Sequence, residues 1–153
     1  AIKAGYGLNF AFKSLDFDED APIATNGINF GYEKKLSGND VLYTDVKYHT
    51  NISHFSTSAK YDGYSYADYA MYVSFGMKNY SVELFNGFFK SIGILYGSTS
   101  NDSFISPDLV LGYAYDLGNV FLAFNLGMGY AIPLSGDRGG LITSMGVSLG
   151  YPL

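Results

Sequence analysis

Apolar residues alternate with small or polar residues along almost the whole chain. The pattern is clearest over 141–153, where one face carries Ser144, Gly146, Ser148 and Gly150 and the other carries mainly Leu, Met, Val and Tyr. A period of two is typical of a β-strand, because successive side chains point to opposite faces. The alternation predicts eight strands, over residues 2–13, 23–34, 41–55, 66–78, 81–96, 107–116, 119–132 and 141–153.

The predicted fifth strand, 81–96, is the least regular. Asn86 and Lys90 interrupt a face that is otherwise apolar from Val82 to Tyr96. A β-bulge would restore the alternation. A short amphipathic helix is the competing prediction, because four apolar residues also fit helical spacing: Phe85, Phe88, Phe89 and Ile92.

The predicted connections alternate in length. Those after strands two, four and six are short, at 36–40, 78–81 and 116–119, whereas the others are mostly longer and polar, at 14–22, 56–65, 97–106 and 133–140. Bacterial outer-membrane barrels have short periplasmic turns and longer extracellular loops. A soluble lipocalin-like ligand-binding barrel is the alternative. The Gly, Ala, Ser and Asn residues of the non-apolar face favour a narrow barrel interior over a solvent-exposed surface.

Composition supports a membrane barrel. Hydrophobic residues make up 48% of the chain and charged residues 15%, below the quarter or so that is usual in soluble domains. No run approaches the roughly 18 apolar residues of a membrane helix. Tyrosines near many predicted strand ends are typical of the aromatic girdles of membrane barrels. The absence of Cys excludes disulfides and thiolate metal sites, and a net charge of −5 argues against nucleic acid as a partner.

The predicted inward face carries charges of both signs, including Lys3, Lys13, Glu33, Lys47 and Lys78. Paired charges would avoid the cost of burying an isolated ion, so we expect a packed interior without a pore. The residues predicted to form an interior polar network are Glu33, Asp45, Lys47 and His49. We expect His49 to be a hydrogen-bonding member of that network rather than a metal ligand.

Length, strand number, turn asymmetry and the last strand together resemble the small outer-membrane barrels of the OmpX/Ail and OmpA-transmembrane-domain kind. Within the last strand, Gly146, Leu149 and Tyr151 resemble the C-terminal signal read by the outer-membrane assembly machinery. The resemblance implies a single domain over 1–153, an all-β, eight-stranded antiparallel up-and-down transmembrane barrel in the bacterial outer membrane. Strand-like sequence begins almost at Ala1, so we expect a mature protein after signal-peptide removal.

Members of this group have diverse roles, so the fold does not select the function. We expect a non-enzymatic structural, accessory or surface-interaction (adhesin-like) protein that acts through its loops or outer wall. The implied partners are outer-membrane lipids and lipopolysaccharide, the assembly machinery, and another membrane protein or surface ligand. No cofactor is expected.

One alternative function is enzymatic. His54, Ser56 and Asp68 supply the base, nucleophile and orienting carboxylate that acyl transfer requires. Their spacing resembles the arrangement in the lipid A deacylase (PagL) family, which implies that Ser56 attacks an acyl ester of lipid A, with His54 as base and Asp68 as orienter. The competing interpretation is a histidine beside a Ser/Thr-rich loop.

The first predicted loop carries an acidic cluster that includes Asp16, Asp18 and Asp20. Carboxylate oxygens suit hard divalent cations, so these residues are a candidate metal site. The cluster lacks the Gly and distal Glu of an EF-hand loop. A solvated acidic loop is therefore the preferred interpretation.

Overall fold

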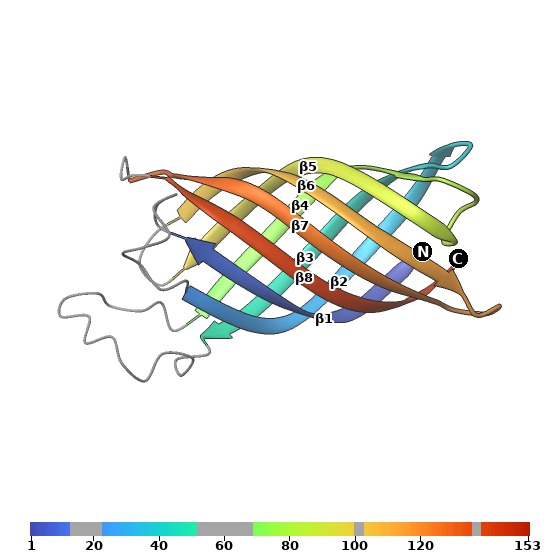
Figure 1. Ribbon diagram of the computed structural model, residues 1–153, viewed down its shortest axis with the longest axis horizontal. Helices are drawn as coiled ribbons and strands as arrows, with labels where there is room; N and C mark the ends of the chain where they lie inside the picture. The colour runs from blue at the N-terminus through green and yellow to red at the C-terminus, as the bar shows by residue number, and fades with distance from the viewer. Residues whose placement is uncertain (13–22, 52–68, 100–102, 136–138) are drawn as a thin grey trace.

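The computed structural model describes residues 1–12, 23–51, 69–99, 103–135 and 139–153. These residues form one closed barrel in which each strand pairs with its neighbours in sequence and the last strand pairs with the first (Figure 1). All eight pairings are antiparallel. The strands are β1 (Ile2–Phe12), β2 (Ile23–Ser37), β3 (Asp40–Asn51), β4 (Tyr69–Tyr80), β5 (Gly87–Thr99), β6 (Ser103–Asp116), β7 (Phe121–Pro133) and β8 (Gly140–Tyr151).

Closure depends on the strand with the most regular alternation. β1 pairs with β8 from Ile2↔Tyr151 to Phe12↔Leu141, so the barrel has no free sheet edge along this seam. Figure 1 shows both chain termini at one end of the barrel, together with the β2–β3, β4–β5 and β6–β7 connections. We call this the terminal end.

The prediction of an eight-stranded all-β barrel is confirmed. The predicted fifth strand is confirmed from Gly87 onward, but its predicted start is wrong: β5 begins at Gly87, and residues 81–86 form a connection between β4 and β5. The helical alternative for 81–96 is therefore wrong as well. β5 and β6 also extend into the predicted 97–106 loop, to Thr99 and from Ser103. The described residues include no helix of the length and apolarity that a membrane span requires.

The small inward residues have a more specific role than filling a narrow space. Aromatic rings lie over glycines directly opposite them on neighbouring strands, in the pairs Phe89–Gly112, Phe104–Gly97 and Phe121–Gly150. A Cβ atom on Gly150 would lie 2.1 Å from Cζ of Phe121, and one on Gly112 would lie 2.2 Å from Cζ of Phe89. The aromatic rings therefore occupy the space that side chains at these glycine positions would fill.

Candidate functional site

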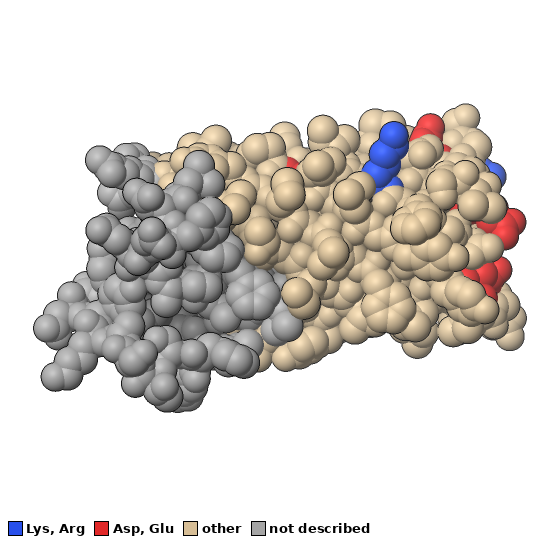
Figure 2. Space-filling view, in the orientation of Figure 1, with Lys and Arg blue, Asp and Glu red and all other residues tan. Residues whose placement is uncertain are grey.

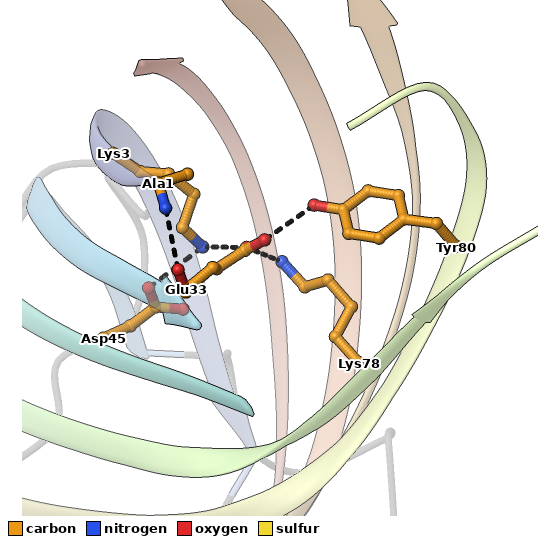
Figure 3. Close-up of polar contacts among 6 residues, drawn as sticks. All are labelled: Ala1, Lys3, Glu33, Asp45, Lys78 and Tyr80. Carbon is orange, nitrogen blue, oxygen red and sulfur yellow. Dashed lines mark hydrogen bonds and ion pairs between the residues drawn. The ribbon is translucent and has the colours of Figure 1, made fainter. Parts of the chain in front are cut away.

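A charged cluster occupies the barrel interior toward the terminal end (Figure 3). Glu33 of β2 is only 2% exposed. Its Oε1 atom lies 2.9 Å from Nζ of Lys3 on β1 and also pairs with Nζ of Lys78 on β4. Its Oε2 atom accepts a hydrogen bond of 2.8 Å from the hydroxyl of Tyr80. One carboxylate thus connects three strands and both of its oxygens are satisfied.

Two further contacts extend this cluster. Nζ of Lys3 also lies 3.1 Å from Oδ1 of Asp45 on β3, so Lys3 bridges two carboxylates. The backbone nitrogen of Ala1 donates to the carbonyl of Glu33 at 2.7 Å, and the nitrogen of Glu33 donates to the carbonyl of Ala1 at 2.9 Å. The chain before β1 is thereby held against β2 beside the charged cluster.

Of the four residues predicted to form the polar network, the structure brings Glu33 and Asp45 together through Lys3. Lys47 and His49 lie farther along β3, away from the terminal end, and line an interior cavity of about 50 Å³ that Asp45 also lines. His49 is buried, and its ring meets that of Tyr72 edge to face at 5.3 Å.

The charged side chains in the described part of the interior balance. The charged side chains enclosed by the described wall are three lysines, Lys3, Lys47 and Lys78, and three carboxylates, Glu33, Asp45 and Asp108. Equal numbers of opposite charges reduce the cost of removing them from water. Parity alone places Lys3 and Lys78 on the inward face. Their shared contact with Glu33 can be predicted only when the register between strands that are distant in sequence is known.

Sequence reasoning missed an aromatic plug at the terminal end. The β4–β5 connection folds so that the ring of Phe85 stacks on that of Phe121 at 4.7 Å and meets that of Tyr80 at 5.7 Å. Phe89 contacts Tyr80 at 5.5 Å. Phe85 has a positive φ of 65°, which non-glycine residues adopt only where packing requires it. We call these four rings the terminal plug.

A second apolar cluster lies farther along the interior. Tyr72 and Leu95 are buried, and Phe104 packs against them, with its ring 6.1 Å from that of Tyr72. The buried Ser74, Ser91 and Ser148 add to the polar lining of the small cavity. The charged cluster and the small cavity are therefore bounded by apolar groups on both sides along the barrel axis.

The outer wall is apolar. Large hydrophobic side chains on all eight strands are exposed, among them Tyr6, Phe30, Val46, Phe75, Ile94, Leu111, Leu126 and Met145. Most exposed tyrosines lie in two groups, with Tyr32, Tyr113 and Tyr151 toward the terminal end and Tyr48, Tyr96 and Tyr130 toward the other. Figure 2 shows a broad wall nearly free of charged side chains, which gather toward one end.

Several predicted site residues lie outside the described residues: His54, Ser56 and Asp68 of the acyl-transfer arrangement, and Asp16, Asp18 and Asp20 of the acidic loop. The residues of the resembled assembly signal lie on β8. Leu149 and Tyr151 are exposed on the outer wall, and Gly146 is on the inward face. Their reading by the assembly machinery stays a prediction.

The architecture is similar to that of two solved bacterial surface proteins. Neisserial surface protein A (NspA) matches with a TM-score of 0.71 and 10% sequence identity, over 99% of this chain and 96% of that one. Ail, the attachment invasion locus protein of Yersinia pestis, matches with a TM-score of 0.56 and 11% identity, over 98% and 95%. No protein-family model matches the sequence, and no curated protein matches it. The chain therefore has the fold of the small eight-stranded outer-membrane β-barrels.

Proposed function

We propose that the protein is a bacterial outer-membrane barrel without a conducting pore, which acts through the surfaces it presents to its surroundings. The observation that carries this proposal is the inversion of the barrel: its apolar side chains face outward, whereas its charged side chains are paired inside. A soluble lipocalin-like barrel would have the opposite arrangement, with a polar outer surface and an apolar ligand cavity.

The membrane location is supported by the extent of the outer wall. Soluble monomers rarely expose continuous apolar patches larger than a few hundred Å², whereas here exposed large hydrophobic residues occur on every strand. The two groups of exposed tyrosines suit the two interfaces of a bilayer. Membrane lipids, including lipopolysaccharide, are therefore the proposed neighbours of the wall, and the outer-membrane assembly machinery is the proposed partner of β8.

The absence of a pore is supported by the interior packing. The cavity of about 50 Å³ beside Asp45 and His49 has room for a few water molecules only. Apolar clusters around Phe121 and around Tyr72 lie on either side of it. A solute crossing the described part of the barrel would have to displace aromatic rings and separate the ion pairs of Glu33.

With the interior closed, the remaining surfaces are the loops and the outer wall. We propose a structural, accessory or surface-interaction role for them, without catalysis. The fold alone does not distinguish among these roles, since barrels of this size serve several.

Detergent dependence and bilayer conductance test the proposal. We expect the protein to stay monodisperse only in detergent, to migrate differently on a gel before and after boiling, and to add no conductance steps to a planar bilayer. A monodisperse protein in detergent-free buffer would overturn the membrane location. Stable conductance steps from the folded wild-type protein would overturn the closed interior.

A matched pair of variants makes the conductance measurement sharper. Phe89 belongs to the terminal plug, whereas its neighbour Phe88 points outward. If the plug seals the interior, Phe89→Ala should increase brief conductance events or proton leakage, and Phe88→Ala should not. If both variants leaked equally, the leakage would result from a general loss of the fold. If neither variant leaked, the interior would be sealed elsewhere in the barrel.

A further inference from the structure

A groove of about 910 Å³ crosses the outer wall from β5 to β1. It lies between two rows of outward side chains that follow consecutive register partners across the strands. The row nearer the terminal end consists of Phe88, Tyr113, Phe124, Val147 and Tyr6. The other row consists of Lys90, Leu111, Leu126 and Met145. Most side chains along the groove are apolar.

The polar side chains on its outward lining gather at one end. Lys90 on β5 is exposed, and it is joined there by Asn79, its register partner on β4, and by Ser81, just beyond β4. The groove is therefore amphipathic along its length, with a cation at one end and mainly apolar side chains over the rest.

We propose that this groove binds one phospholipid, with its phosphate at Lys90 and one acyl chain along the apolar part. The inference rests on the proposed function, because it requires the outer wall to face a bilayer. The lipid would belong to the leaflet at the terminal end, where the short turns of outer-membrane barrels face the periplasm.

The groove runs obliquely from near the terminal end toward the middle of the barrel, which fits a lipid in its normal orientation. Lys90 lies near the start of β5 at Gly87, close to the terminal end, whereas Met145 lies in the middle of β8 (Gly140–Tyr151). A phosphate at Lys90 would thus be near the bilayer interface, and the chain would run toward the bilayer centre. Because paired strands lie about 4.8 Å apart, the five strands give the groove a length of about 19 Å.

Charge complementarity favours a phosphate-bearing lipid over an apolar occupant. A lysine on a lipid-facing wall is costly at the bilayer centre and tolerated near the interface, where its ammonium meets anionic groups. Ser81 adds a hydroxyl donor at the same end. A second copy of the chain, or another membrane protein, would cover the apolar part without needing Lys90.

The test is native mass spectrometry of the delipidated barrel titrated with palmitoyl-oleoyl phosphatidylglycerol. The variant is Lys90→Gln, and the matched control is Lys34→Gln, which removes an exposed lysine of β2 outside the groove. We expect wild type and Lys34→Gln to retain one lipid with equal affinity, and Lys90→Gln to bind it about fivefold more weakly. Equal affinity of the two lysine variants would overturn the proposal.

A second pair of variants tests the acyl-chain part. Val147→Phe adds a ring in the apolar part of the groove on β8, and Val73→Phe makes the same change on β4, outside it. Only Val147→Phe should weaken binding. Equal binding by both, or a dimer that excludes the lipid, would overturn the proposal. The gel shift on boiling should persist in all four variants, so failure of lipid binding is distinguishable from failure of the barrel itself.

Discussion

The inner and outer faces of one wall differ within adjacent residues. Phe88 and Phe89 follow each other on β5, yet the first is 69% exposed and the second 5%. Phe88 meets Tyr113 on the outside, whereas Phe89 packs over Gly112 and beside Tyr80 inside. The same residue type thus serves two environments, and the environment is set by strand parity alone.

The two faces are also stabilised differently. The outer face is mostly apolar, and many apolar side chains suit a lipid neighbour there. The inner face depends on specific partners, such as Lys3 and Lys78 for Glu33, or Gly150 for the ring of Phe121. The effect of an inward substitution on the free energy of unfolding should therefore depend on which partner is lost. The effect of an outward substitution should depend on its depth in the bilayer.

Glu33→Gln should have the largest effect. It removes the charge that two lysines share, and breaking a buried ion pair from one side costs about 3–5 kcal/mol. The free energy of unfolding in urea, measured in lipid vesicles, should fall by this amount. Glu83→Gln, in the exposed β4–β5 connection, is the control and should change it by less than about 0.5 kcal/mol. Equal effects would mean that the charged cluster contributes no specific stability.

Leu126→Arg should be next in size. Leu126 is an exposed residue in the middle of β7, and an arginine near the bilayer midplane destabilises a membrane barrel by about 2–4 kcal/mol. Leu36→Arg, at the terminal end of β2, should cost about 0–1 kcal/mol. The same urea titration measures both. A barrel that tolerates both arginines equally would not have its wall in hydrocarbon.

Gly150→Ala tests the contact between ring and glycine. The added Cβ would lie 2.1 Å from Cζ of Phe121, and overpacking of this kind costs about 1–3 kcal/mol. Phe121→Leu in the same chain should recover part of the loss, because it removes the ring that clashes. A double-mutant cycle of unfolding free energies measures the coupling. Strict additivity would show that Gly150 and Phe121 are independent.

The strained residue of the plug should give the smallest effect. Phe85→Gly and Phe85→Ala both remove the ring, but only glycine adopts a φ of 65° without strain. We expect the glycine variant to be more stable than the alanine variant by about 1 kcal/mol. Thermal or urea unfolding of the two variants side by side measures the difference. A more stable alanine variant would mean that residue 85 relaxes to another backbone conformation.

The strand count, the order of strands and the facing of side chains could all be predicted from sequence. Outward residues such as Tyr32 alternate with inward residues such as Glu33 over long stretches. A period of two therefore predicts directly which face of the sheet each side chain occupies. Position 87 as the start of β5 could not be predicted. Val82 and Leu84 continue the alternation through a connection, so periodicity alone did not reveal the turn.

The partners within the interior could not be predicted either. Lys3, Glu33 and Lys78 are far apart in the chain, and their contact depends on the register of three strand pairs and on closure of the barrel. The alternation predicts which residues face the interior, but it does not predict where along the barrel axis each of them lies. The same limit applies to the groove at Lys90, which exists only because residues from neighbouring strands lie in register.

The most direct test of the inverted barrel is fluorescence quenching at two adjacent positions. The sequence contains no Trp, so Phe88→Trp and Phe89→Trp each introduce a single reporter. In vesicles of lipids brominated near the headgroup end of the acyl chain, Trp emission should be strongly quenched in the Phe88→Trp variant and largely preserved in the Phe89→Trp variant. Equal quenching at both positions, or stronger quenching for Phe89→Trp, would contradict an apolar wall in lipid around a sealed interior.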